Sequence, residues 1–203
     1  MSPDPTPTKG EATKQRILVC AVARFAGEGF RGTSVAQIAR DAEVTAPTVH
    51  AHFGSKEDLF QAAFAYDIEA LLEMFRDRIA GGLSMSAPAG LIPELLAELG
   101  SHPLARRVFQ GREADRTRDL LQLPAVVRAR EDLTALVEGG QHAGLLRADL
   151  SPAALAGALE TIVLALLLGG VQIGMIGGED RRLAILAVIS AGLRAPASES
   201  NSR

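Results

Sequence analysis

The most chemically informative stretch of the sequence is TAPTVHAHF, close to residue 50, because it carries hydroxyl and imidazole side chains at short intervals. Val49 and Phe53 are four residues apart, a spacing that would anchor one side of a short helix in a core. Thr48, His50 and His52 then lie on the opposite or flanking side, where they can donate and accept hydrogen bonds. A helix of this size that projects from a small core fits the major groove of DNA. The chemistry indicated is therefore hydrogen bonding to a nucleic acid.

A first short helix is predicted just before this stretch, beginning after Ser34. The Ser34 hydroxyl can accept a hydrogen bond from an otherwise unpaired backbone N–H of the first turn. Apolar residues recur after it at i, i+3, i+4 and i+7, which indicates one buried helix face. These residues are Val35, Ile38, Ala39 and Ala42.

The second helix has its own start and stop signals. Thr45 can cap it, and Pro47 falls in its first turn, where a missing N–H costs little. Gly54 is placed to end it in a left-handed conformation, and Ser55 can cap a third helix at once. Together with an amphipathic helix over residues 13–27, these elements predict a three-helix unit that presents the second short helix as a probe.

The segment from Gln15 to Phe64 resembles the N-terminal domain of TetR-family transcriptional repressors. The residues that carry the resemblance are Ile17, Ala21, Phe25, Gly29-Phe30, Ser34-Val35, Ile38-Ala39, Val44-Thr45, Pro47-Thr48-Val49-His50, His52-Phe53 and Ser55-Lys56. One departure is His50, which stands where the family often has tyrosine.

The resemblance implies that polar residues of the second helix contact phosphates or base edges and that Lys56 holds a phosphate. The full set of candidate DNA-binding residues is Ala36, Gln37, Thr45, Ala46, Pro47, Thr48, His50, Ala51, His52 and Lys56. Three of these are alanines, for which we expect apolar contacts with thymine methyl groups.

Composition favours an all-helical chain. The 203 residues are 47% hydrophobic, have no Trp, and show no alternating strand pattern. The single cysteine excludes an internal disulfide framework and is compatible with a reducing cytoplasm, where we expect the protein to act. The net charge is −3, but residues 9–53 carry +2, so binding to DNA should depend on a few placed contacts and weaken with salt.

The remainder of the chain predicts further helices, about nine in total. Their expected ranges are 56–79, 91–100, 103–116, 124–143, 152–176 and 179–193, with a loop at 81–90. We expect a disordered segment at 1–12, a helix-turn-helix DNA-binding domain at 13–55, a helical effector-binding and dimerisation domain at 56–195, and a disordered tail at 196–203.

Two of these helices are apolar on all sides, since residues 162–176 contain one polar side chain, Gln172, and residues 183–193 contain only Ser190. Such helices must be covered, and we expect a partner subunit to cover them in a four-helix interface. The alternative, a membrane span, is disfavoured because the first run is short and interrupted by glycines. The expected interface residues are Leu164, Leu167, Leu168, Val171, Met175, Leu183, Leu186, Ile189 and Leu193.

An effector pocket among the middle helices is implied by the resemblance. Its candidate residues are Phe64, Met74, Phe75, His102, Arg106, Phe109, Gln110 and His142. His50 and His52 are two residues apart on a helix and diverge, and no cysteine or carboxylate spacing completes a metal site. Because no nucleophile elbow, phosphate loop or HExxH motif is present either, we expect no enzyme activity and no cofactor.

The sequence therefore predicts a homodimeric, ligand-responsive transcriptional repressor that binds a near-palindromic DNA operator and is released by an apolar small-molecule effector. Two alternatives stay open at this point: a constitutive DNA-binding regulator without an effector, and a helical protein-interaction module.

Overall fold

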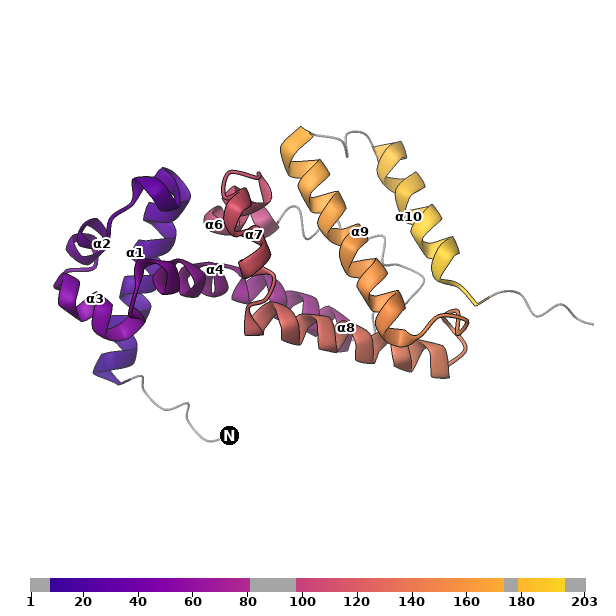
Figure 1. The fold of residues 1–203 in the computed structure, drawn as a ribbon. Helices are drawn as coiled ribbons and strands as arrows, with labels where there is room; N and C mark the ends of the chain where they lie inside the picture. The colour runs from indigo at the N-terminus through magenta and orange to yellow at the C-terminus, as the bar shows by residue number, and fades with distance from the viewer. Residues whose placement is uncertain (1–7, 81–97, 174–178, 196–203) are drawn as a thin grey trace, which may run out of the picture. The chain divides into compact units, whose positions relative to one another are not determined.

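The computed structural model describes residues 8–80, 98–173 and 179–195, and within these ranges the chain is helical without a strand. The all-α prediction is therefore confirmed, and the described residues form nine α-helices and one short 3₁₀ helix (Figure 1). Their bounds are α1 (Lys9–Gly32), α2 (Val35–Asp41), α3 (Ala46–Phe53), α4 (Lys56–Ala80), η1 (Leu99–Ser101), α6 (Pro103–Phe109), α7 (Ala114–Leu120), α8 (Pro124–His142), α9 (Pro152–Ile173) and α10 (Glu179–Leu193).

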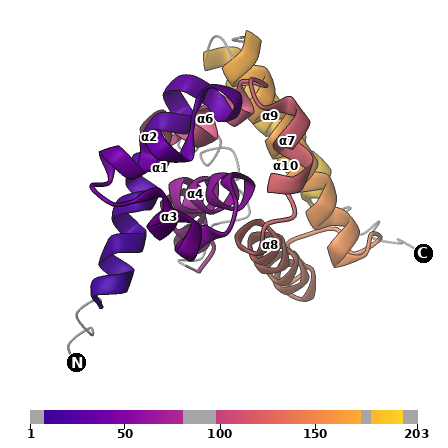
Figure 2. The ribbon, with the colours of Figure 1, turned by 60° about the vertical axis from the view of Figure 1, so that its left-hand side comes forward.

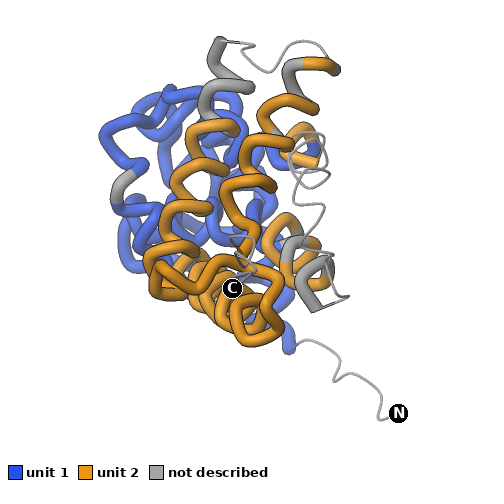
Figure 3. The backbone as a smooth tube through the Cα atoms, turned by 90° about the vertical axis from the view of Figure 1, so that its right-hand side faces the viewer, with its two compact units in different colours: residues 1–70, 101–123 blue, residues 71–100, 124–203 orange. Residues whose placement is uncertain are grey.

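The chain divides into two compact units (Figure 3). Unit 1 comprises residues 1–70 and 101–123, and unit 2 comprises residues 71–100 and 124–203. The boundary expected at residue 55 does not coincide with this division, because α6 packs against α1 and joins the helix-turn-helix in one unit. The expected 13–55 and 56–195 domains thus remain a proposed functional division.

Unit 1 is built around an aromatic core. Phe25 of α1 meets Phe60 of α4 edge to face at 5.0 Å between ring centroids, and Phe30 meets the same ring at 5.4 Å. Edge-to-face pairs of this kind add to the stabilisation gained from burial. Ile38 of α2 and Val49 of α3 are also fully buried, so both short helices are anchored. Figure 2 shows α2 beside α1 and α3.

Unit 2 has an aliphatic core. α8 and α9 pack along each other, and the buried residues Val137, Leu146, Leu155, Ala156 and Leu193 form one cluster. An isolated antiparallel bridge joins Leu146 to Arg194, so the end of α10 is tied to the loop after α8. No helix among the described residues has the length and apolarity that a membrane crossing requires.

The start of the chain differs from the prediction of disorder over residues 1–12. α1 begins at Lys9, because Thr8 caps it and Glu11 returns a hydrogen bond to the Thr8 backbone N–H at 2.7 Å. This reciprocal Thr-x-x-Glu arrangement is a capping box, a sequence signal that the prediction overlooked. Residues 1–7 and the expected tail at 196–203 lie outside the described residues.

Two further helix predictions need correction. The helix expected over 103–116 is two helices, because Gly111 adopts a φ of 74° between α6 and α7. α1 runs past its expected end at residue 27 to Gly32, with a break at Gly29, where φ is 77°. The loop expected at 81–90 lies outside the described residues, as does most of the helix expected at 91–100.

Candidate DNA-binding site

α3 is held by signals that lie within its own sequence. The Thr45 hydroxyl accepts the Thr48 N–H at 3.3 Å, and Pro47 occupies the first turn, as predicted. Val49 and Phe53 are buried, which fixes the inner side of the helix. The outer side consists of half-buried Thr48 and exposed His50, Ala51 and His52, which we call the reading face.

The other candidate DNA-binding residues flank the reading face along the chain. Ala36, Thr45 and Pro47 are exposed, while Gln37, Ala46 and Lys56 are half-buried. Every candidate from the sequence therefore keeps some accessible surface.

Hydrogen bonds within the protein already engage part of this set. The side-chain oxygen of Gln37, Oε1, accepts the Ser34 N–H at 2.7 Å in a capping box, and its side-chain nitrogen, Nε2, donates to Glu28 at 3.3 Å. The hydroxyls of Thr45 and Thr48 bond each other at 2.9 Å. Gln37 thus serves first to start α2, and a base contact by its amide would compete with that role.

His50 is linked to the residue that ends α3. Its Nδ1 lies 2.8 Å from the carbonyl oxygen of Gly54, and the Gly54 N–H donates to the His50 carbonyl at 2.8 Å. Gly54 has φ 73° and ψ −71°, a left-handed conformation that suits glycine. The imidazole is therefore fixed at one of its two nitrogens.

Lys56 stands at the start of α4 and leans over an aromatic ring. Its ammonium nitrogen is 4.4 Å from the centroid of Phe30, and the guanidinium carbon of Arg116 from α7 is 3.3 Å from the same centroid. Cations attracted to a ring face in this way lose mobility without losing charge. Phe30 thereby holds one candidate phosphate-binding side chain close to the DNA-binding helices.

Charged side chains fix α2 against α1. Arg24 donates to both carboxylate oxygens of Asp41, at 2.5 and 3.0 Å, and to Glu28 at 2.6 Å. The hydrogen bond from Arg24 lowers the pKa of Asp41, and the reciprocal bonds raise the pKa of Arg24. Arg16 also donates to the carbonyl of Ala42 at 2.8 Å, at the end of α2. The two hydrogen bonds from Arg24 to Asp41 fix the orientation of α2 relative to α1.

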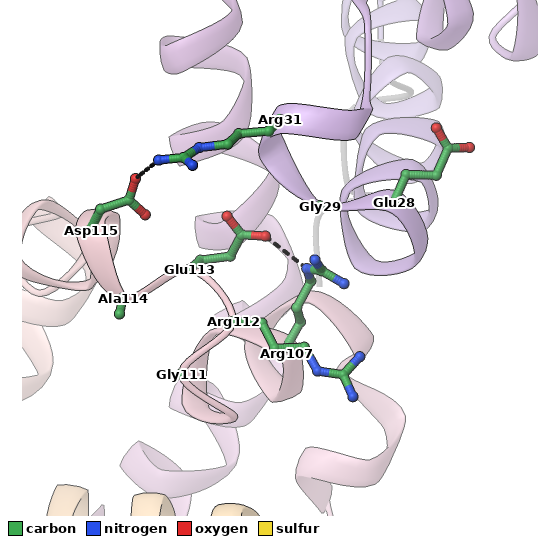
Figure 4. A pocket seen from close by; sticks show the side chains of 9 residues that line it. All are labelled: Glu28, Gly29, Arg31, Arg107, Gly111, Arg112, Glu113, Ala114 and Asp115. Carbon is green, nitrogen blue, oxygen red and sulfur yellow. Dashed lines mark hydrogen bonds and ion pairs between the residues drawn. The ribbon is translucent and has the colours of Figure 1, made fainter.

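A second group of charged side chains holds the end of α1, where the helix is broken. These side chains belong to α6 and to the loop that follows α6. Arg107 donates from Nε to Glu113 at 2.7 Å and from Nη1 to the Ala26 carbonyl at 3.3 Å. Glu113 also accepts the Phe30 N–H at 3.3 Å. We call Arg107 and Glu113 the α1 clasp. They line a pocket of about 400 Å³ (Figure 4), where an exposed pair, Arg31 with Asp115, lies nearby.

A buried carboxylate on α4 caps α6. Asp67 accepts the N–H groups of Leu104 and Ala105 at 2.9 and 2.8 Å, and its other oxygen lies 3.8 Å from Nδ1 of His102. Burial raises the pKa of Asp67, while these hydrogen bonds and His102 oppose the rise. Neither Asp67 nor the clasp was predicted from the sequence. Asp67 could have been found as a charged residue on the otherwise apolar stripe of α4, whereas the clasp has no local signal.

The candidate effector-pocket residues are distributed over both units. In unit 1, Phe64 and His102 are buried, Phe109 and Gln110 are half-buried, and Arg106 is exposed. In unit 2, Met74 is half-buried and His142 is exposed, and the side chain of Phe75 lies outside the described residues. The pocket of Figure 4 is lined by none of them.

The candidate dimer residues also differ in accessibility. Leu183 is 58% exposed and Leu164 is half-buried, while Ile189 packs against the core and Leu193, at 4% exposure, belongs to it. Leu193 therefore has almost no surface to offer a partner. The side chains of Leu167, Leu168, Val171, Met175 and Leu186 lie outside the described residues.

Comparisons with known proteins agree with this arrangement. Residues 17–63 match the family described as bacterial regulatory proteins, tetR family. The HTH-type transcriptional regulator UidR of Escherichia coli (strain K12) is 36% identical over 74 residues, which cover 36% of this chain and only 38% of UidR. A transcriptional regulator of the TetR family from Cytophaga hutchinsonii has the same fold, with a TM-score of 0.70 and 17% identity over 95% of this chain and 100% of that chain.

The HTH-type transcriptional repressor SCO4008 of Streptomyces coelicolor gives the longer alignment. It is 30% identical over 154 residues, which cover 70% of this chain and 71% of SCO4008. The similarity thus extends well beyond the helix-turn-helix into the second half of the chain. By fold, local geometry and sequence, the chain belongs to the TetR family of bacterial regulatory proteins.

Proposed function

We propose that the protein is a transcriptional repressor that binds a near-palindromic DNA operator as a homodimer in the cytoplasm. The observation that carries the proposal is the reading face: polar side chains exposed on a short helix whose inner side, cap and C-terminus are all fixed. Such a helix can enter a major groove without further folding. SCO4008 and NicS from Pseudomonas putida are both described as HTH-type transcriptional repressors, which supports repression and not activation as the proposed function.

Dimerisation is supported by apolar side chains left exposed on the last two helices of unit 2. Ile162 on α9 is 38% exposed, and Leu183 and Val188 on α10 are 58% and 73% exposed. Covering these side chains with a second copy would remove apolar surface from water. The dimer would place two copies of α3 in successive major grooves, about 34–36 Å apart.

We further propose that a small apolar effector binds the C-terminal part of the chain and releases the operator. This proposal is supported by family membership and by the aliphatic core of unit 2. An effector can lower operator affinity only if it binds one conformer of the repressor more tightly than the other. A constitutive regulator without an effector is the alternative, and a thermal-shift screen of small molecules separates the two.

The test is selection of operators from random duplex DNA by the full-length protein, followed by affinity measurements at several salt concentrations. We expect a two-fold symmetric site, and we expect Thr48→Ala combined with His50→Ala to abolish specific binding while the dimer and its helical content persist. Val19→Ala is the matched control, because Val19 is 51% exposed on α1 and lies outside the reading face. Selection of no sequence, even at low salt, would favour a protein-interaction module.

A further inference from the structure

The hydrogen bond between His50 and Gly54 fixes which imidazole nitrogen carries the proton. His50 Nδ1 lies 2.8 Å from the Gly54 carbonyl oxygen, which has lone pairs and no hydrogen. A carbonyl oxygen can only accept, so the proton of this bond must reside on Nδ1. In a neutral imidazole the other nitrogen, Nε2, then carries a lone pair and accepts.

The Gly54 carbonyl is itself held in place. The Ser55 N–H donates to the Phe53 carbonyl at 2.8 Å, which makes Gly54 the centre of a γ-turn with φ 73° and ψ −71°. This turn is rare in proteins and strained for other residues. Together with the bond from the Gly54 N–H to the His50 carbonyl at 2.8 Å, this bond holds the Gly54 carbonyl beside Nδ1.

The surroundings of His50 leave few other polar groups to determine base recognition. Ala46 and Ala51 have no hydrogen-bonding side chains, and the hydroxyls of Thr45 and Thr48 bond each other at 2.9 Å, which leaves one hydroxyl hydrogen of the pair free to donate. Because His50 is exposed, its Nε2 can meet a base edge. His50 is thus the imidazole of the reading face whose tautomer is determined by the hydrogen bond to Gly54.

DNA offers few groups that can satisfy such an acceptor. Phosphate oxygens, guanine O6 and N7, and thymine O4 are all acceptors, so none of them can form a hydrogen bond with the Nε2 lone pair of a neutral His50. The exocyclic amino groups of adenine (N6) and cytosine (N4) are the donors of the major groove. We infer that His50 reads an adenine or cytosine amino group through Nε2 and does not bind a phosphate. This inference rests on the proposed DNA-binding function.

The protonation of His50 can be measured directly by nuclear magnetic resonance. The full-length protein is labelled with ¹⁵N-histidine, and the four histidines are assigned by loss of single signals in histidine-to-glutamine variants. Long-range ¹H–¹⁵N correlations separate the two neutral tautomers and the doubly protonated ring. We expect His50 to be the Nδ1–H tautomer both free and bound to operator. An Nε2–H tautomer, or a doubly protonated ring in the complex, would overturn the inference.

The base contact is tested with the operator obtained by selection. In one series, single adenines or cytosines are replaced by analogues that lack the amino group; in two others, guanine becomes 7-deazaguanine or a phosphate becomes a methylphosphonate. We expect His50→Ala to lower affinity by about fivefold on the unmodified operator, the effect of one net hydrogen bond, and by almost nothing where the correct amino group is missing.

His52→Ala is the comparison variant, because His52 is an exposed histidine on the same helix. His52→Ala should lower affinity by the same factor whether or not the operator carries the adenine or cytosine amino group assigned to His50. If His50→Ala instead loses its effect on a methylphosphonate or 7-deazaguanine operator, His50 is a donor and the inference is wrong. Failure to select any operator would refute the proposed function itself, which is a separate result.

Discussion

Replacing Glu113 with alanine should destabilise the protein more than replacing Asp115, an exposed carboxylate that lines the same pocket (Figure 4). The Glu113 side chain is 6% exposed and accepts hydrogen bonds from Arg107 and from the Phe30 N–H. Removing one partner of a buried ion pair costs about 3–5 kcal/mol, because the remaining charge stays buried. The Arg107 side chain is 16% exposed and keeps its bond to the Ala26 carbonyl, so the loss should lie near the lower limit, about 3 kcal/mol.

Glu113→Gln separates charge from shape. The amide retains an oxygen that can accept both hydrogen bonds but removes the negative charge, so we expect a loss of about 1–2 kcal/mol. The assay is urea-induced unfolding followed by circular dichroism at one fixed protein concentration, since the stability of a dimer depends on concentration.

Asp115→Asn is the matched control for this series. Asp115 pairs with Arg31 at 3.2 Å in the same pocket, but the two side chains are 56% and 88% exposed. Exposed pairs contribute little, so this variant should stay within about 0.5 kcal/mol of the wild type. If Glu113→Ala were no more destabilising than Asp115→Asn, the clasp would not hold the end of α1.

Three further outcomes are expected. Gly29→Ala should lose about 1–3 kcal/mol in the same unfolding assay, because φ is 77° and a Cβ would clash with the α1 clasp. Burial raises the pKa of Asp67 above 3.8, so the native state binds this proton more tightly, and the contribution of Asp67 to stability falls as pH rises through the raised value. Asp67→Asn should consequently gain stability relative to the wild type as the pH rises above 3.8 and through the raised pKa of Asp67, and a difference that does not change with pH would refute this. Val188→Glu on α10 should give a monomer by light scattering, whereas Val19→Glu on α1 should stay dimeric.

The helix-turn-helix was predictable because its determinants are local. Ser34, Thr45 and Gly54 each act within three or four residues of their own position, and the structure shows all three at the helix ends where the sequence placed them. These signals can be recognised in a sequence because they stand at fixed spacings from the helix ends.

The interactions that hold this segment were not predictable in the same way. Glu113 and Phe30 are 83 positions apart, and Asp67 is 38 positions from Ala105. In the sequence, a carboxylate that caps a distant helix cannot be distinguished from a solvated carboxylate, because its partner is close only in the folded chain. The grouping of α6 and α7 with the helix-turn-helix depends on such contacts, which is why the boundary expected at residue 55 differs from the compact units.

The distribution of aromatic residues has a practical consequence for spectroscopy. The chain lacks tryptophan and has one tyrosine, Tyr66, which lies in unit 1 together with every phenylalanine except Phe75. Tyrosine fluorescence therefore reports on the melting of unit 1 alone, and unit 2 gives no tyrosine signal. Comparison of that signal with far-ultraviolet circular dichroism would show whether the two halves melt together, with no probe introduced.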